Sequence, residues 1–397
     1  MADNKDKKVL NVPALRFPEF TGEWERHKLS EVCSFYSGGT PSSSKKEYYN
    51  GNIPFIRSGE LHKDYTELFI TEAGLSNSAA KLVETGDLLL ALYGATSGDI
   101  AISKIKGAIN QAILCIRTKQ NKKFIESVWN KHVERLLQTY LQGGQGNLSA
   151  DIVKNIPFYF ANSNEQDKLA KFISLLDERI ATQNKIIEKY ESLIQAIIYK
   201  EKMDGISKGT WQRIALCKVL QERNEKNVNG RTICSVSVSQ GVVNQVEYLG
   251  RSFAAKQTSH YNIVKYGDIV YTKSPTGNFP YGIIKRSNIR EDVAVSPLYG
   301  VYIPASDSIG VFLHFYFMQP SNAFNYLHPL IQKGAKNTIN ITNGRFLENS
   351  VLLPISKSEA NTIAGILKTI QAKIEIEKNL LQSYTKEKEY LLRQMFI

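Results

Sequence analysis

The segment at 164–203, NEQDKLAKFISLLDERIATQNKIIEKYESLIQAIIYKEKM, decides the fold of this chain. One stripe recurs along it at alternating steps of three and four, and comprises Leu169, Ile173, Leu176, Ile180, Gln183, Ile187, Tyr190, Ile194 and Ile197. This heptad pattern, with isoleucine at every a position, predicts a helix that lays one seam against a partner helix. About 40 residues at 1.5 Å per residue form a rod of roughly 60 Å.

The partner helix is predicted near the end of the same chain. At a constant offset the stripe returns as Ile363, Leu367, Ile370, Ile374, Glu377, Leu381, Tyr384, Lys388 and Leu391. Its interruptions coincide as well, because Gln183 corresponds to Glu377 and Tyr190 to Tyr384. Shared interruptions favour an internal duplication over two unrelated amphipathic helices.

Length and charge set the limits of the fold and of the partner class. A chain of 397 residues is too long for one compact core and predicts two domains with connecting elements. Its 50 Lys and Arg residues exceed its 38 Asp and Glu residues, giving a formal charge of +12 that favours a polyanionic partner. No segment offers about 20 uninterrupted apolar residues, so we expect no membrane partner.

The cysteines and histidines show no metal-binding or disulfide pattern. Cys33, Cys115, Cys217 and Cys234 lie far apart without a C-x-x-C pair, and we expect buried thiols of a cytoplasmic protein. The chain also lacks a Pro-Pro dipeptide, a phosphate-binding glycine loop, a G-x-S-x-G elbow and a histidine cluster. We therefore expect no catalytic residues, no metal site and no cofactor in this chain.

The two globular segments repeat one plan. In the first, apolar runs at 53–56, 88–93, 100–102 and 112–116 predict strands of a mixed sheet, and 122–141 predicts a helix. The second repeats this plan loosely: Trp24 returns as Trp211, and the turn Gly86-Asp87 as Gly267-Asp268. We expect both tryptophans to be buried anchors and both Gly-Asp pairs to lead into core strands.

The predicted fold class is therefore α+β. Globular mixed domains at 1–162 and 206–356 alternate with long helices at 163–205 and 357–397. The helices are expected to form an antiparallel coiled coil, and the whole chain a pseudo-twofold internal repeat.

The loops of both globular domains combine positive charge with hydrogen-bonding side chains. Lysine and arginine suit phosphates, whereas Ser, Thr, Asn and Gln suit base edges. The first-half candidates for DNA contact are Thr40, Ser42, Ser43, Ser44, Lys45, Lys46, Tyr48, Arg57, Ser58, Lys63, Tyr93, Thr96, Ser97, Asn110, Gln111, Gln145 and Asn147. The second-half candidates are Lys256, Gln257, Lys273, Ser274, Thr276, Asn278, Lys333, Lys336 and Asn337. The alternative is that these are solvated loops without a ligand.

A second apolar strip runs beside the seam of the two helices. It comprises Phe172, Leu175, Ile186, Leu193, Ile198, Ile366, Leu380 and Leu392. Two helices cannot cover both strips, so we expect part of the second to receive a partner protein. Packing against the globular domains is the alternative near the helix ends.

Several short motifs resemble one known family. They are Gly39-Thr40-Pro41-Ser42, the run 49–56, Gly86-Asp87-Leu88-Leu89, Asn110-Gln111-Ala112, and Asn155-Ile156-Pro157 leading into Glu165-Gln166. Together with the alternation of domains and helices, they resemble the specificity subunit of type I restriction-modification systems. The second half departs from the pattern, with Ser358-Glu359-Ala360 where the first has Asn164-Glu165-Gln166.

The resemblance implies two target recognition domains, each reading one half of a bipartite, asymmetric double-stranded DNA site, on helices that fix their spacing. It implies two methyltransferase subunits, which bring S-adenosylmethionine, and two restriction subunits, which bring ATP and Mg. This chain is then the non-catalytic reader. The alternatives are a structural adaptor with two protein-binding domains and, third, an enzyme acting alone on nucleic acid.

Overall fold

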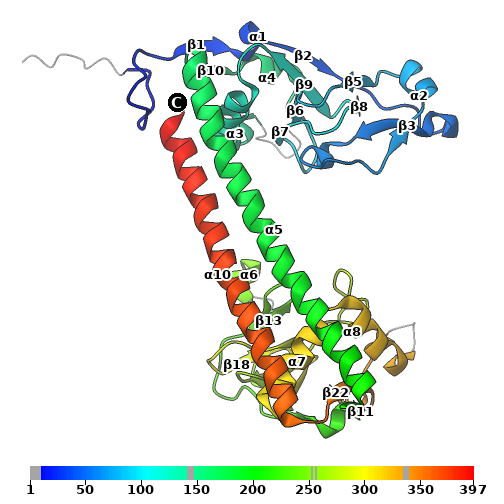
Figure 1. The fold of residues 1–397 in the computed structure, drawn as a ribbon. Coiled ribbons are helices and arrows are strands. Elements are labelled where there is room, and N and C mark those ends of the chain that lie inside the picture. The colour runs from blue at the N-terminus through cyan, green and yellow to red at the C-terminus, as the bar shows by residue number, and fades with distance from the viewer. Residues whose placement is uncertain (1–9, 141–146, 252–253, 255–256, 334–338) are drawn as a thin grey trace, which may run out of the picture. The chain divides into compact units, whose positions relative to one another are not determined.

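The computed structural model describes residues 10–140, 147–251, 254, 257–333 and 339–397. The chain divides into two compact units (Figure 1). Unit 1 comprises Met1–Gln183 with Leu380–Ile397, and unit 2 comprises Asn184–Asn379. The long helices α5 (Ser163–Lys208) and α10 (Lys357–Met395) each begin in one unit and end in the other.

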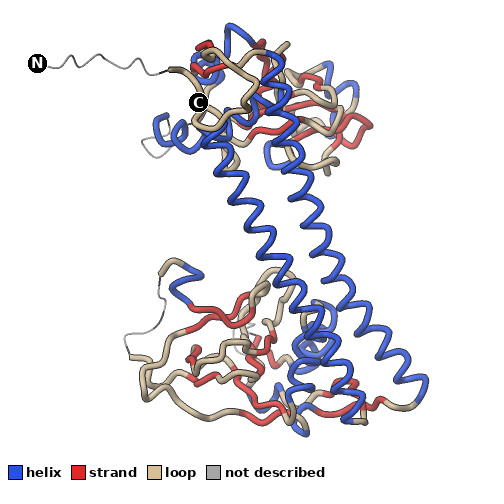
Figure 2. Tube along the Cα trace, turned by 60° about the vertical axis from the view of Figure 1, so that its left-hand side comes forward, coloured by secondary structure: helices blue, strands red, loops and turns tan. Residues whose placement is uncertain are grey.

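The two long helices lie side by side and antiparallel in each unit (Figures 1 and 2). In unit 1, Lys388 Nζ lies 2.5 Å from Asp177 Oδ1, and the Arg179 guanidinium donates to the Tyr384 hydroxyl at 2.8 Å. In unit 2, Lys378 pairs with Glu191 at 3.3 Å. The a-position residues Ile173, Ile187 and Ile194, and the polar Gln183, are buried. The predicted seam is therefore the buried face of α5.

Unit 1 is built on two four-stranded sheets. The antiparallel sheet has the order β2-β9-β6-β7, with β2 at Cys33–Ser37, β9 at Ile113–Thr118, β6 at Leu88–Ala91 and β7 at Ile100–Ile102. The mixed sheet has the order β4-β3-β8-β5, with β4 at Phe69–Ile70, β3 at Tyr49–Ile56, β8 at Gly107–Ile109 and β5 at Lys81–Val83. A further strand pair joins β1 (Glu25–Lys28) to β10 (Pro157–Phe160).

The helices of unit 1 other than α5 and α10 are α1 (Leu29–Val32), α2 (Glu72–Ser76), α3 (Lys122–Tyr140) and α4 (Ala150–Asn155), with 3-10 turns at Lys46–Tyr48 and Ser58–Glu60. The helix expected from residue 122 is thus present as α3. Its buried face, which includes Phe124 and Trp129, belongs to the main core of unit 1.

Unit 2 repeats the antiparallel sheet in the order β12-β19-β16-β17. These strands are β12 at Leu220–Glu222, β19 at Gly300–Pro304, β16 at Ile269–Tyr271 and β17 at Ile284–Arg286. Two-stranded pairs are β11 (Trp211–Ala215) with β22 (Ser350–Pro354), β13 (Cys234–Ser237) with β14 (Gly241–Asn244), β15 (Asn262–Val264) with β18 (Val293–Val295), and β20 (Gln332–Lys333) with β21 (Ile339–Asn340).

The shorter helices of unit 2 are α6 (Gln245–Leu249), α7 (Asp307–Phe317), α8 (Pro320–Leu327) and α9 (Asn343–Phe346), with 3-10 turns at Leu216–Lys218 and His328–Leu330. Of these, α7 packs against β17, at the edge of the four-stranded sheet.

The duplication reaches individual hydrogen bonds. Gly86 and Gly267 both adopt positive φ, at 90° and 93°, where glycine avoids the strain of a side chain. Gly86 N–H donates to the Ser103 carbonyl at 2.7 Å, and Gly267 N–H to the Ser287 carbonyl at 2.9 Å. Trp24 and Trp211 are both buried, as predicted. The two halves therefore share a frame that was duplicated, not merely a similar composition.

Cys115 and Cys234 are buried, but Cys33 is half-buried and Cys217 is exposed, which corrects the expectation of four buried thiols. Cys217 lies in a short 3-10 turn between two strands. No helix in the described part of the chain is both long and apolar enough to cross a membrane.

Candidate nucleic-acid interface

Three predicted DNA-contact residues meet at the ends of strands in unit 1. Thr40 follows β2, Tyr93 follows β6, and Gln111 follows β8. The Thr40 hydroxyl donates to Gln111 Oε1 at 2.7 Å. Burial raises the pKa of Tyr93, while a hydrogen bond with Gln111 acts in the opposite direction. Segments far apart in sequence thus present hydroxyl and amide groups together, as a reader of base edges requires.

The loop from Thr40 to Tyr48 carries the exposed polar side chains of this region. Ser42, Ser43, Ser44, Lys45 and Lys46 are all exposed. Lys45 Nζ donates to the Tyr48 hydroxyl at 3.0 Å and lies 5.0 Å from the centre of that ring. Because the Tyr48 ring is buried, this residue anchors the loop and does not offer a free face for DNA, which corrects its assignment.

Arg57 is also corrected as a phosphate contact. Its guanidinium lies 2.8 Å from Glu60 Oε1 and 3.0 Å from Glu67 Oε2, and these partners raise the Arg57 pKa. Burial alone would raise the pKa of Glu60, but hydrogen bonds from Arg57 and Thr66 outweigh it and lower that pKa to about 2. The positive charge of Arg57 is therefore already neutralised within the chain, where it secures the turn that begins at Ser58.

Other candidates in unit 1 have partly structural roles. Ser97 donates to the Leu92 carbonyl at 2.9 Å, and Asn110 Oδ1 accepts the Ala112 N–H at 3.0 Å. The Lys63 ammonium lies 5.0 Å from the centre of the Tyr65 ring. Thr96 is half-buried. These contacts fix the loop conformations, and the Asn110 amino group and the Lys63 ammonium are the groups left for a ligand.

The second-half candidates lie on the equivalent connection of unit 2. Tyr93, Thr96 and Ser97 belong to the β6–β7 connection; Lys273, Ser274, Thr276 and Asn278 belong to the β16–β17 connection. Thr276 and Phe279 exchange two backbone hydrogen bonds of 3.0 Å, which close a tight turn with the Ser274, Thr276 and Asn278 side chains exposed. Burial lowers the pKa of Lys273. The candidates of the two halves, chosen separately from the sequence, thus lie on equivalent connections of the two units.

Gln145, Lys256, Lys336, Asn337 and the side chain of Lys333 lie outside the described residues. Asn147 and Gln257 are exposed beside two of these gaps.

Sequence reasoning missed two loops that the repeat identifies. The β18–β19 connection, at 296–299, is the equivalent of Asn110 and Gln111, and its Leu298 is 70% exposed. The β12–β13 connection corresponds to the Thr40 loop and carries the exposed Arg231. A register alignment of the two halves through their Gly-Asp turns could have found both.

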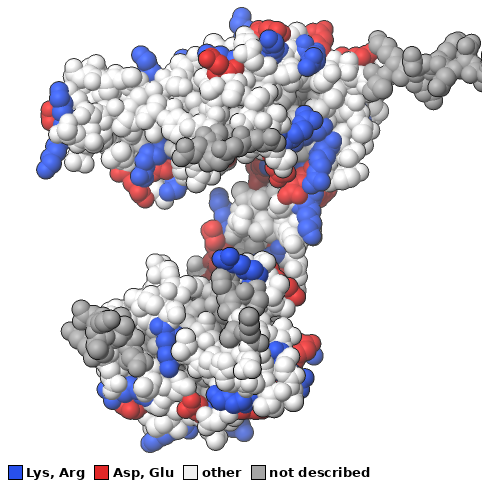
Figure 3. Space-filling model, turned by 180° about the vertical axis from the view of Figure 1, so that it is seen from behind, with Lys and Arg blue, Asp and Glu red and all other residues white. Residues whose placement is uncertain are grey.

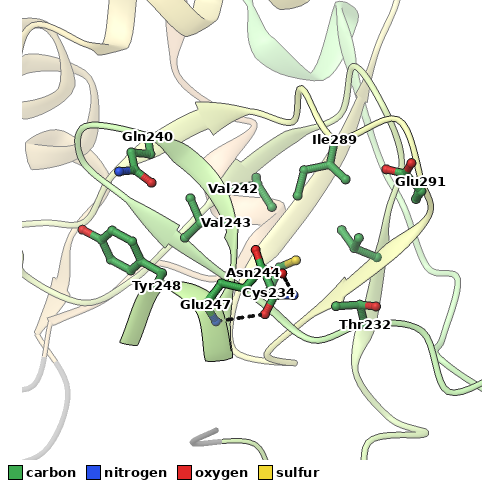
Figure 4. A pocket seen from close by; sticks show the side chains of 11 residues that line it. Thr232, Cys234, Gln240, Val242, Val243, Asn244, Glu247, Tyr248, Ile289 and Glu291 are labelled. Atoms are coloured by element: carbon green, nitrogen blue, oxygen red, sulfur yellow. Dashed lines mark hydrogen bonds between the residues drawn. The ribbon is translucent and has the colours of Figure 1, made fainter. Parts of the chain in front are cut away.

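Unit 2 also has a hollow of about 640 Å³ beside this region (Figure 4). It lies among β13, β14, α6 and the segment before β18, with Gln240 and Tyr248 at one end and Thr232 and Glu291 at the other. Its charged lining residues are Glu247 and Glu291, so it is unsuited to phosphate. On the face drawn in Figure 3, basic and acidic side chains are intermixed.

The predicted partner strip is exposed in part. Leu175, Leu193 and Ile366 are 54%, 43% and 41% exposed, while Phe172, Ile186 and Leu380 are half-buried. In unit 2, Leu193 and Ile366 line a shallow hollow of about 470 Å³ together with Tyr190 and Gly365.

Ile198 and Leu392 are corrected as members of the strip. They are 2% and 8% exposed, so the chain itself already covers them, and Leu392 belongs to the core of unit 1. For Leu392, near the end of α10, the core of unit 1 provides this cover.

Among the described residues, no group of three or more His, Cys, Asp or Glu side chains is placed to hold a metal ion. Nor do the candidates above assemble a nucleophile with an adjacent base. Their chemistry is that of hydrogen bonding and charge, which suits binding.

Comparison with known proteins points to one family that this chain resembles. Residues 21–192 match the family model described as the type I restriction modification DNA specificity domain. The MjaVIII specificity subunit of Methanocaldococcus jannaschii is 21% identical across 98% of this chain and 95% of its own length. The EcoR124I/EcoR124II specificity subunit of Escherichia coli is 27% identical across 41% of this chain and 43% of its own length.

Solved structures show the fold. The S subunit of a type I restriction-modification system from M. genitalium superposes with a TM-score of 0.60 at 14% identity, covering 97% of this chain and 99% of that one. A structure concerning complex assembly of the type I system gives a TM-score of 0.51 at 12% identity, covering 94% and 97%. With a duplicated α+β frame, two long helices and polar loops at equivalent strand ends, the chain resembles the specificity subunits of type I restriction-modification systems in fold and, over residues 21–192, in sequence.

Proposed function

We propose that this chain reads DNA sequence for a type I restriction-modification complex, with each recognition domain reading one half of a bipartite site. One observation carries the proposal: the β6–β7 connection carries hydroxyl groups, and the equivalent β16–β17 connection of the repeated sheet carries hydroxyl, amide and amino groups. A repeated frame with different loops suits two related readings of different base sequences.

The proposal assigns catalysis to partner subunits. The chain carries none of the nucleotide-binding or nucleophile motifs that methyl transfer or ATP-driven cleavage would use. We assign S-adenosylmethionine to two methyltransferase subunits, and ATP and Mg to two restriction subunits. The chain acts in the cytoplasm, where the DNA is.

The exposed part of the apolar strip is proposed to receive the methyltransferase subunits. Leu193 and Ile366 should each be changed to Asp, because a charge cannot be buried in an apolar interface without a large desolvation cost. Co-purification with the methyltransferase subunit should be lost. The matched control is Ile376→Asp, since Ile376 lies on the same helix as Ile366, is 64% exposed and is outside the strip. Equal loss in the control would place the interface elsewhere.

DNA binding is tested by a mobility-shift assay with the methyltransferase subunit present. Lys45→Ala with Lys46→Ala should weaken binding to all sequences alike and reduce the salt slope by about 1 for each DNA phosphate that the variant no longer neutralises. Arg57→Ala is the control, because its guanidinium is already paired and its removal should affect stability and not the salt slope.

The division between half-sites is tested by changing one domain. Thr276→Ala with Asn278→Ala should alter the methylated sequence in one half-site and leave the other intact, as genome-wide mapping of methylated adenine would show. The alternative is a structural adaptor with two protein-binding domains. It predicts no sequence-specific DNA binding by wild-type protein, a result that would contradict the proposal.

A further inference from the structure

Lys285 is a buried lysine in unit 2 that the DNA-reading role does not use. It lies in β17, the edge strand of the four-stranded sheet, opposite Val270 of β16. The residue is 2% exposed. Among the described residues, no hydrogen-bond or ion-pair partner is found for its ammonium group. The side chain is therefore buried, while its ammonium nitrogen stays accessible to a small molecule.

The electrostatics of Lys285 agree with its position. Burial lowers the pKa of this amine to about 8, and no neighbouring carboxylate counteracts the shift. The group is therefore still mostly protonated at neutral pH, and a nearby anion would stabilise its charged form.

The internal repeat shows that the frame does not need this lysine. The strand registers pair Leu89 with Ala101 in unit 1 and Val270 with Lys285 in unit 2, so Ala101 is the equivalent residue. Ala101 is also buried, in an apolar cluster with Leu89 and Ile105. Since an alanine serves the same sheet in the first half, the lysine has a role that is particular to the second.

Lys285 lines a cavity of about 580 Å³ that lies wholly within unit 2. Its walls come from α5, α10, α7, β17 and the turn between β13 and β14. The hydrogen-bonding side chains of the lining are Gln195, Ser239, Gln240, Asn288, His314 and Gln371. A volume of this size is typical of small-molecule sites.

The charged lining residues other than Lys285 have partners. Glu191 is paired with Lys378 at 3.3 Å, and Glu375 accepts a hydrogen bond from Gln371 at 2.7 Å. Glu375 keeps its negative charge, because its partner is a neutral amide, but neither carboxylate of the lining shifts the pKa of Lys285. Of the cations that the described lining contributes, Lys285 is the one left without a partner, so an anion is favoured at the Lys285 side of the cavity.

His314 strengthens this preference as a neutral donor. Its Nδ1 accepts the Arg286 backbone N–H at 3.1 Å, which leaves the ring hydrogen on Nε2. Burial, and then the neighbouring Lys285 and Arg286, lower the His314 pKa well below its usual range. The imidazole is therefore uncharged and can donate one hydrogen bond beside the ammonium group.

We propose that this cavity is a binding site for a small anion of the carboxylate or phosphate class, held by the Lys285 ammonium with His314 and the lining amides. The site joins a recognition domain to the helix pair within unit 2. A bound anion would pair the Lys285 charge and stabilise that junction.

The experiment uses the full chain with inorganic phosphate and with citrate as probes, at constant ionic strength set by sodium chloride. The midpoint temperature of thermal unfolding should rise by several degrees at a saturating concentration of the probe, because a ligand that binds the folded state alone stabilises it. In parallel, the dimethylated Lys285 resonance should be followed by NMR, and its pKa should increase on addition of the probe.

Two variants control the test. Lys285→Ala reproduces the residue of the first half, and Lys285→Met keeps the length of the side chain without its charge. Both should fold, as checked by circular dichroism, and both should lose the probe-dependent stabilisation. Stabilisation of the same size in both variants would show binding at the surface and overturn the proposal.

A second arm separates a free anion from a DNA phosphate. A cognate duplex without added phosphate or citrate should leave the Lys285 resonance unchanged. If the duplex shifts that resonance and the free anions do not, the lysine contacts DNA and the proposal fails. If the protein responds to the anions but shows no sequence-specific DNA binding, the proposed function fails and the anion site stands.

Discussion

Unit 1 and unit 2 share a sheet but complete it in different ways. In unit 2, α5 runs directly into β11 through Gly209 and Thr210, and the Thr210 N–H donates to the Gly205 carbonyl at 2.9 Å. In unit 1, two distant segments make the equivalent junction, and the Leu15 N–H donates to the Gln394 carbonyl at 2.9 Å. The duplicated frame therefore tolerates either a continuous or an interrupted connection.

The heads of the long helices show the same contrast in polar contacts. Glu165, at the start of α5, accepts two hydrogen bonds of 2.7 Å from Arg16 and one of 3.2 Å from the Trp24 indole. Glu359, near the start of α10, accepts one of 2.7 Å from the Trp211 indole and one of 3.4 Å from Thr210. The tryptophan-to-glutamate bond is common to both halves, although the flanking sequences differ. In unit 1, where two separate segments form the junction, the ion pair between Arg16 and Glu165 takes the place of the continuous chain that joins α5 to β11 in unit 2.

The largest effect is expected from lengthening the helices that both halves share. One heptad inserted in each helix, after Tyr190 and after Tyr384, preserves the seam and adds about 10 Å to each. The methylated sequence should keep its half-sites but gain a gap longer by about three base pairs, or methylation should become poor because the groove has rotated. Genome-wide methyladenine mapping measures this. Full activity at the original gap would show that the helices do not set it.

The second prediction compares the two helix heads. Glu165→Gln leaves Arg16 without its carboxylate at a site where Glu165 is 1% exposed, and should cost about 3–5 kcal/mol of unfolding free energy. Glu359→Gln removes charge from a bond with neutral donors and should cost about 1 kcal/mol. Urea denaturation of both variants measures the difference. Equal losses would mean that the ion pair adds nothing to the interrupted junction.

The third prediction concerns the continuous junction. A Cβ added at Gly205 would lie 1.9 Å from Trp211 Cδ1, so Gly205→Ala forces the tryptophan out of place and should cost about 1–3 kcal/mol. Gly365→Ala is the matched control, because this helical glycine has no atom within 4 Å of the added Cβ and should stabilise by up to about 1 kcal/mol. Thermal denaturation should therefore move in opposite directions for the two variants.

The smallest effect is a pH dependence confined to unit 1. The folded-state pKa of Glu60, about 2, lies below its ordinary value, so its stabilisation is present above that ordinary value and is lost as pH falls toward 2. The contribution should be about 1 kcal/mol, because Arg57 is 46% exposed and solvent screens the pair. Glu60→Gln should flatten the stability profile between about pH 4.5 and 2, measured by urea denaturation. An unchanged profile would exclude the pair as its cause.

The long helices and most strands could be predicted from sequence because their periodicity extends over many residues. The Gly-Asp turns and both tryptophans were likewise readable, since each depends on local backbone or on a large apolar side chain. The site was less accessible. From the sequence, Arg57 was expected to be free, but in the structure it bonds to Glu60 and Glu67. Tyr48 was expected in an accessible loop, but its ring is buried. Arg57 and Glu60 are only three residues apart, but that spacing brings them together only when the segment forms a turn, and the sequence showed no clear signal for this turn.

The interrupted junction of unit 1 has a consequence for synthesis of the chain. The core of this unit includes Trp24 and Phe124 but also Met395 and Phe396, whose ring lies 5.5 Å from that of Phe124. Unit 2 is contiguous, so a nascent chain can close it once Asn379 has left the ribosome. Unit 1, although its first residues are synthesised earlier, can therefore complete its core only after unit 2 has been synthesised. A chain released from the ribosome before Phe396 would have an incomplete core in unit 1 and would be open to proteolysis.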